Sequence, residues 1–201
     1  MTLAAPWIRA MQSAPAASPG ELDAETLAEC RAGSARALRL FVVRYQNVVF
    51  AYLSRTLGAG PHVEDLAQEV FLRACRGLAR FDASGTARPS TWLLTIANRV
   101  VIDARRRRRP SAALLTDDIA AAAAGTPETE WRRSEIGHAL AQAAAQLTDE
   151  QRDVFVLAEF HDLDTASIAR VLGIREATAK TRLFRARERL RELLQTQREA
   201  L

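Results

Sequence analysis

The sequence predicts an all-α protein of two small helical domains joined by a flexible linker. The 201 residues include only 9 Gly and 7 Pro, and an alanine-rich composition of this kind favours helices. Apolar residues recur at spacings of three and four along two separate stretches, as on one face of a helix. The stretches are separated by residues 110–130, a low-complexity segment without arginine that is typical of a linker.

The first domain is expected over residues 21–109, after a disordered leader at 1–20 that is rich in proline and alanine. The segment GAGP (58–61) ends the first helical stretch, and a second amphipathic helix follows. The segment from Phe81 to Pro89 is expected to be a loop. Ser90 or Thr91 can cap a third helix that runs into the five arginines at 105–109.

The second domain is expected over residues 131–201 and to contain a helix-turn-helix. Thr148 and Asp164 are candidate helix caps, and Gly173 can adopt the left-handed conformation that ends a helix. A short helix, a glycine turn and a second helix are the parts of a helix-turn-helix. Ile174 would fill the core beneath the turn. The side chains expected to face inward from the second helix are Ala179, Leu183, Ala186 and Leu190.

The charge pattern favours a polyanionic partner. The net charge is +4, and nearly every cation is an arginine, whose guanidinium can contact phosphate through two hydrogen bonds. High genomic GC content is the competing explanation for this arginine bias. The helix after Gly173 carries most of one cationic cluster, and Arg105–Arg109 form the other. Each is also compatible with a solvated basic surface.

Other classes of site find little support in the sequence. Cys30 and Cys75 are isolated and are expected to be small buried residues, with a redox pair as the alternative. No pattern of ligands predicts a metal or another cofactor, and no catalytic triad or phosphate-binding loop is present. We expect no enzyme activity, no small-molecule substrate and no membrane insertion, in a cytoplasmic protein.

Three segments in order resemble the extracytoplasmic-function (ECF) sigma factors of the sigma-70 family. These are DLAQEVFLRA, then STWLLTIA with a following D and RRR, then LTDEQRDVFVLAEF, IARVLGI and TAKTRLFRARERLREL. The resemblance implies a subunit that directs core RNA polymerase to promoters, without nucleotide hydrolysis. Its implied partners are the β′ clamp helices and β flap of core polymerase, promoter DNA, and an anti-sigma factor.

The resemblance also assigns roles to residues. Residues 21–109 would melt the minus-ten element, and 131–201 would read the minus-thirty-five element. Asp65, Gln68 and Glu69 would dock on polymerase. The minus-thirty-five contacts would be Arg175, Thr178, Lys180, Thr181, Arg182, Arg185 and Arg187. The minus-ten and phosphate contacts would be Phe81, Arg88, Ser90, Trp92, Asn98, Arg99, Arg105 and Arg106.

Two other functions remain open on the sequence. A stand-alone helix-turn-helix regulator would use its N-terminal domain to dimerise or to sense a ligand. An acidic surface on residues 64–78 and the lack of a ligand-pocket signature favour the sigma factor instead. An enzyme of nucleic-acid metabolism is disfavoured because paired metal-binding carboxylates are absent from the sequence.

Overall fold

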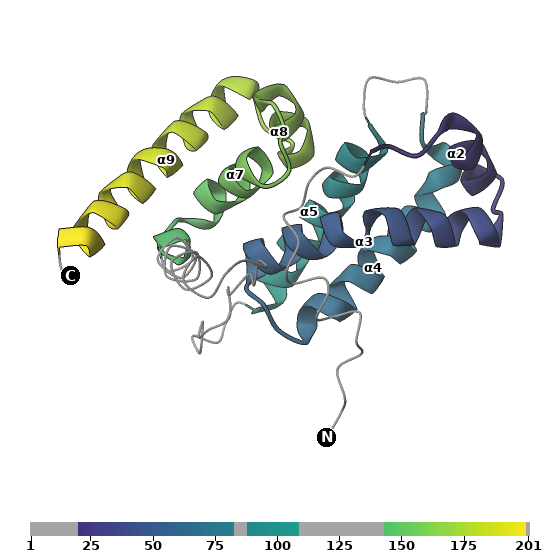
Figure 1. The fold of residues 1–201 in the computed structure, drawn as a ribbon, viewed down its shortest axis with the longest axis horizontal. Helices are drawn as coiled ribbons and strands as arrows, with labels where there is room; N and C mark the ends of the chain where they lie inside the picture. The colour runs from purple at the N-terminus through teal and green to yellow at the C-terminus, as the bar shows by residue number, and fades with distance from the viewer. Residues whose placement is uncertain (1–19, 83–87, 109–142, 200–201) are drawn as a thin grey trace, which may run out of the picture. The chain divides into compact units, whose positions relative to one another are not determined.

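The computed structural model describes residues 20–82, 88–108 and 143–199, which contain helices and no strand. The predicted all-α fold is therefore confirmed for these ranges (Figure 1). The chain has two compact units: the first contains residues 20–108, and the second contains most of residues 143–199. The expected linker at 110–130, nearly all of the expected leader and the start of the second domain lie outside the described residues.

The first two helices are separated by a glycine turn that the apolar spacing does not reveal. Helix α2 (Ala24–Arg31) is capped by Asp23, whose carboxylate accepts from the Thr26 amide at 2.7 Å. The turn after α2 contains Gly33, with φ of 83°, whose amide donates to the carbonyl of Cys30 at 3.1 Å. Ser34 then caps α3 (Ala35–Leu57). The Gly-Ser pair is the signal for this break.

Three long helices pack together in the first unit. Helix α3 contacts both α4 (His62–Gly77) and α5 (Pro89–Arg108), and these two also contact each other. The short 3-10 helix η1 (Leu78–Arg80) follows α4. Helix α5 begins at Pro89, so Ser90 and Thr91 lie inside its first turn and neither is the cap that was expected; proline is well tolerated at this position. The largest fully buried side chains between these elements are Phe41, Tyr45, Tyr52, Leu53, Leu78, Leu93 and Leu94.

The predicted helix-turn-helix lies among the C-terminal helices, most of which belong to the second unit. Helix α7 (Asp149–Glu159) begins with a capping box in which Thr148 and Gln151 each bond to the backbone of the other. Asp164 caps α8 (Thr165–Leu172) by accepting from the Ser167 amide at 2.7 Å. Gly173 has φ of 67° and leads into α9 (Glu176–Glu199). Both predicted caps and the glycine turn are confirmed.

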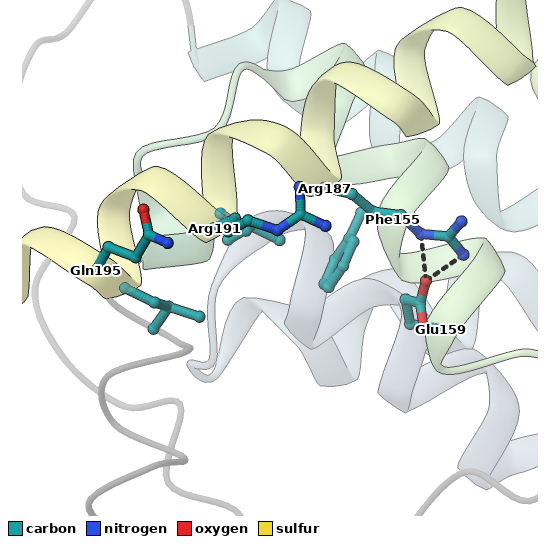
Figure 2. A pocket seen from close by; sticks show the side chains of 7 residues that line it. Phe155, Glu159, Arg187, Arg191 and Gln195 are labelled. Atoms are coloured by element: carbon teal, nitrogen blue, oxygen red, sulfur yellow. Dashed lines mark hydrogen bonds and ion pairs between the residues drawn. The ribbon is translucent and has the colours of Figure 1, made fainter. Parts of the chain in front are cut away.

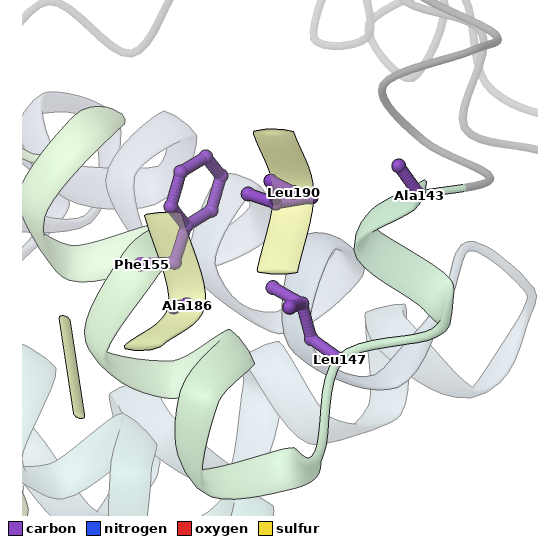
Figure 3. Packing of buried hydrophobic residues seen from close by; sticks show 5 residues of the cluster. All are labelled: Ala143, Leu147, Phe155, Ala186 and Leu190. Atoms are coloured by element: carbon purple, nitrogen blue, oxygen red, sulfur yellow. The ribbon is translucent and has the colours of Figure 1, made fainter. Parts of the chain in front are cut away.

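The apolar side of α9 packs against α7. Phe155 of α7 meets Ala186 and Leu190 of α9 in a buried cluster that Ala143 and Leu147 complete (Figure 3). Ala179 and Leu183 are buried as well, so the predicted inward face of α9 is confirmed. Ile174 is only half-buried, which is less than expected for a residue that fills the core.

Candidate nucleic-acid interface

The outward side of α9 presents polar, cationic and aromatic side chains. Because the buried residues follow one stripe of the helix, Thr181, Phe184 and Arg185 lie on the opposite side, and all three are exposed. Thr178, at the start of the helix, is half-buried, and Arg175 is exposed in the turn before it. The N-terminal part of the predicted recognition helix therefore offers side chains that can reach a DNA groove.

Two of the predicted DNA-binding arginines connect α9 to α7. Arg182 lies 2.8 Å from a carboxylate oxygen of Glu150, at the start of α7. Arg187 lies 2.6 Å from Glu159, at the end of the same helix. The two pairs flank the apolar contact between the helices, so these cations also orient the recognition helix.

Lys180 is paired within its own helix. Its ammonium group lies 2.9 Å from Glu176, which also accepts from the Thr165 hydroxyl at 3.2 Å. The hydrogen bond from Lys180 is the main cause that lowers the pKa of the Glu176 carboxyl. Within the described ranges, Arg175 and Arg185 have no carboxylate partner. Among the cations predicted to contact the minus-thirty-five element, these two are the most available to phosphate.

Phe184 is a candidate contact that the sequence pattern does not single out. Its side chain is 66% exposed, although a phenylalanine on a helix usually packs into a core. It lies three residues after Thr181 and directly before Arg185. The signal available in the sequence was its position outside the stripe formed by Ala179, Leu183, Ala186 and Leu190.

A shallow groove of about 480 Å³ lies between the end of α7 and the C-terminal half of α9. Figure 2 shows Phe155 in its wall and the ion pair of Arg187 with Glu159 at one side. Leu190 and Leu194 supply further apolar surface. Arg191 and Gln195 complete the lining. The groove combines an apolar surface with a cationic margin, which suits a protein segment better than it suits a nucleic acid.

The predicted polymerase-docking residues differ in their surroundings on α4. Asp65 and Gln68 are exposed. Glu69 is half-buried, with oxygen Oε1 lying 2.5 Å from Arg73 and 3.8 Å from Arg107 of α5. The structure thus brings Glu69 into contact with the helix predicted to face DNA. The sequence pattern gave no indication of this contact between Glu69 and α5.

Arg73 extends that connection between the two helices. Its guanidinium also lies 3.1 Å from Asp103 of α5. Next to these charges, Leu72 is 58% exposed and lies four residues after Gln68, on the same side of α4. An exposed leucine beside acidic and amide side chains is a second feature of this surface that the sequence pattern missed.

The predicted minus-ten residues fall into exposed and buried groups. Ser90 is half-buried and donates from its hydroxyl to Glu21 at 2.5 Å. Trp92 is half-buried, and its ring centroid lies 5.0 Å from that of Phe81. Arg105 donates to the carbonyl oxygen of Thr56 at 3.4 Å. The exposed members of the set are Arg88, Arg99 and Arg106.

Two residues of that set, Phe81 and Asn98, have buried side chains. Phe81 is only 5% exposed because it packs against Trp92. Asn98 is 4% exposed, and its side-chain oxygen accepts from the Tyr52 hydroxyl at 3.1 Å. Contact between DNA and either side chain would require this packing to open. The sequence did not indicate this burial, because Phe81 was expected to begin a loop and Asn98 is a polar residue.

The described residues give little support for a redox site, a metal site or a membrane-spanning helix. Cys30 is buried and Cys75 is half-buried; both are free thiols. Burial raises the pKa of both, which disfavours the reactive thiolate. Within the described ranges, no three His, Cys, Asp or Glu side chains gather as metal ligands. In the same ranges no helix combines the length and hydropathy needed to cross a membrane.

Comparison with protein families identifies two matching segments. The family described as Sigma-70 region 2 matches residues 41–110. Sigma-70, region 4 matches residues 137–190. The RNA polymerase sigma-H factor of Pseudomonas aeruginosa is 32% identical over 185 residues, which cover 87% of this chain and 95% of that protein. The ECF RNA polymerase sigma factor SigL of Mycobacterium tuberculosis is 35% identical over 170 residues, covering 82% and 92%.

Solved structures agree with this comparison. CnrH in complex with the cytosolic domain of CnrY has a TM-score of 0.61 and 25% identity, covering 86% of this chain and 96% of that one. The sigma factor RpoE in complex with the anti-sigma factor NepR, from Bartonella quintana, has a TM-score of 0.64 and covers 80% and 98%. Its 21% identity supports the fold alone.

Proposed function

Because this chain belongs to the ECF family of sigma-70 RNA polymerase sigma factors, we propose which of its surfaces bind core polymerase and which bind promoter DNA. Residues 21–109 dock on core polymerase and open the minus-ten element. Residues 131–201 read the minus-thirty-five element. The observation that carries the proposal is that the two units expose different charge: Asp65 and Gln68 are exposed on α4, and cations are exposed on α9.

In the minus-thirty-five contact, the first turns of α9 enter the major groove. Thr178, Lys180 and Thr181 lie where a recognition helix meets base edges, and Arg175 and Arg185 bind phosphates. Phe184 contacts a thymine methyl group, because an exposed aromatic ring can gain apolar contact there. Arg182 and Arg187 reach phosphates from their positions beside α7.

In the polymerase contact, α4 binds the β′ clamp helices. Exposed Asp65 and Gln68 suit a basic protein surface, and Leu72 adds apolar area that would otherwise face water. Glu69 contributes from a half-buried position, with Arg73 and Arg107 next to its carboxylate. The groove between α7 and α9 receives the β flap, whose apolar side chains would cover Phe155 and Leu194.

In the minus-ten contact, the exposed arginines Arg88, Arg99 and Arg106 bind the backbone of the melted strand. Ser90 and Trp92, at the start of α5, lie beside that strand. Arg105 lies near the C-terminal end of α5. Extruding a base costs a few kcal/mol of unstacking, which the phosphate contacts must offset. Melting draws on this binding energy, without catalysis by the sigma factor.

Control by an anti-sigma factor completes the proposal, in a protein that acts in the cytoplasm. It is supported by CnrH, which was solved in complex with the cytosolic domain of CnrY and is 25% identical to this chain. A partner that covered Asp65 and Gln68 on α4 would block the polymerase-docking surface. Because the sigma factor must bind polymerase before it acts at a promoter, the same partner would also prevent the α9 surface from acting there.

The test is reconstituted transcription with core polymerase on genomic DNA, followed by mapping of start sites. We expect initiation at a limited set of promoters that share upstream elements. Gel-shift assays with those promoters separate the alternatives, because a stand-alone regulator binds its operator without polymerase. Tight, specific binding by the protein alone, with no polymerase-dependent initiation, would contradict the proposal.

A further inference from the structure

Glu21 connects the start of α5 to α3 from a position far away in the sequence. Its carboxylate oxygen Oε1 accepts from the Ser90 hydroxyl at 2.5 Å. Its other oxygen, Oε2, accepts from the Tyr45 hydroxyl at 2.7 Å and from the Ser90 amide at 3.4 Å. A single carboxylate therefore has contacts with both helices.

The backbone on both sides of Glu21 is held to α3. The amide of Leu22 donates to the Tyr45 oxygen at 3.2 Å. The Nε atom of Arg44 donates to the carbonyl of Gly20 at 2.7 Å. Because residues 20–22 have these contacts, the position of the carboxylate is set by α3.

The contact lies at the part of α5 that needs a hydrogen-bond acceptor. The first amides of a helix have no partner within the helix, and a negative charge near them is favourable. Ser90 is the second residue of α5, so the Glu21 carboxylate supplies an acceptor to one of these amides. The start of α5 thereby acquires a fixed place relative to α3.

We propose that Glu21 is a positioning residue for promoter opening, because its carboxylate holds the first turn of α5 in the geometry that receives the melted strand. The inference rests on the proposed function, in which Arg88, Ser90 and Trp92 meet that strand. These three residues all lie within one turn of the bonded Ser90 amide. A shift of this turn displaces all of them together, whereas docking through α4 and reading through α9 do not depend on it.

The experiment compares holoenzymes that carry Glu21→Ala, Glu25→Ala or the original sequence. Glu25 is an exposed acid in the first turn of α2, and its substitution matches the change in charge. The template is a promoter obtained by start-site mapping, prepared as a full duplex and with the melted segment mismatched. We expect Glu21→Ala to slow opening of the duplex by about tenfold, the factor that one charge-assisted hydrogen bond supplies.

On the mismatched template, Glu21→Ala should initiate at nearly the original rate, and Glu25→Ala should behave normally on both. Glu21→Gln, which keeps an acceptor oxygen, should recover part of the rate of opening. Tyr45→Phe, which removes one donor to the carboxylate and leaves α5 unchanged, should slow duplex opening by a smaller factor. Thermal unfolding of each variant shows whether the protein is folded at the assay temperature.

Equal defects of Glu21→Ala on both templates would overturn the inference, because they would indicate a general loss of structure. Faster opening would overturn it too, since the carboxylate would then be competing with a DNA phosphate for Ser90. Failure of the original protein to initiate at any promoter would instead contradict the proposed function. The two failures are therefore distinguishable.

Discussion

Arg187 and Glu159 join the recognition helix to α7 through two hydrogen bonds to one carboxylate oxygen. The Nε atom of Arg187 lies 2.9 Å from Oε1 of Glu159, and the terminal nitrogen lies 2.6 Å from the same atom (Figure 2). The arginine side chain is 55% exposed, so solvent screens the attraction. The pair orients α9 more than it stabilises the fold.

Arg185 and Arg187 should therefore respond differently to removal. Arg185→Ala is expected to change the free energy of unfolding by less than about 0.5 kcal/mol, as at an ordinary surface position. Arg187→Ala should lower it by no more than about 1 kcal/mol. Transcription from promoters that depend on a minus-thirty-five element should fall more for Arg185→Ala. Urea unfolding and run-off transcription measure the two effects, and a larger transcription loss for Arg187→Ala would contradict this assignment.

Asp65→Arg should weaken binding to core polymerase without unfolding the protein. The side chain is exposed, so the substitution leaves the packing of α4 unchanged, while the reversed charge would face a basic partner surface. We expect the dissociation constant, measured by fluorescence anisotropy with labelled protein, to rise about tenfold or more. Glu25→Arg on α2 is the control. Unchanged affinity of Asp65→Arg would place the docking surface elsewhere.

Glu69 is a less suitable target for that test. Its carboxylate contacts Arg73 and Arg107, so a reversed charge there would also repel two arginines within the first unit. Loss of polymerase binding in a Glu69→Arg variant could then arise from a displaced α5. Comparison with Asp65→Arg separates the two causes.

Gly173→Ala should destabilise the helix-turn-helix by about 1–2 kcal/mol, the cost of a left-handed conformation for a residue with a Cβ atom. Gly173 has φ of +67°, and a Cβ atom added there would meet nothing within 4 Å, so the cost comes from the backbone alone. Gly173→Asn should cost less, because asparagine visits this conformation more readily. Chemical unfolding, monitored by circular dichroism, measures the free energy of unfolding of both variants and shows whether Gly173→Asn is the more stable of the two. Equal stability of both variants and the original protein would contradict it.

Tyr45→Phe should flatten the loss of stability in alkaline solution. Burial, together with the hydrogen bond donated to Glu21, raises the pKa of the Tyr45 phenol above its ordinary value. A raised pKa means that the native state favours the neutral phenol. The contribution of Tyr45 to the free energy of unfolding is therefore fully present below about pH 10 and is lost as pH rises further. The difference in unfolding free energy between the original protein and Tyr45→Phe should shrink above about pH 10. A constant difference across that range would contradict the assignment.

Several features of the fold were predictable because they depend on neighbours in the sequence. Thr148 and Asp164 bond to amides three residues later, and Gly173 adopts its conformation within a single turn. The buried side of α9 follows from helical spacing alone. The break between α2 and α3 was also local, at Gly33 and Ser34, but continuous apolar spacing concealed it.

The candidate site was less predictable because charge and burial depend on partners elsewhere in the chain. A list of cations on α9 does not distinguish Arg187, paired with Glu159, from Arg185, which is exposed without a described carboxylate partner. Phe184 is exposed, whereas Phe81 is buried, although both are phenylalanines next to a basic residue. The packing of the helices determines whether each of these side chains is buried or exposed.

The sequence by itself determined the all-α class, the helix caps Thr148 and Asp164, the helix-turn-helix and the family, because these depend on spacing and on residue types in order. The tertiary structure decided which side chains remain exposed and which are paired, as with Glu69 against Arg107 and Glu21 against Ser90. Those contacts join residues 38 or 69 positions apart, a separation over which only the packing of helices brings atoms within hydrogen-bond or ion-pair distance.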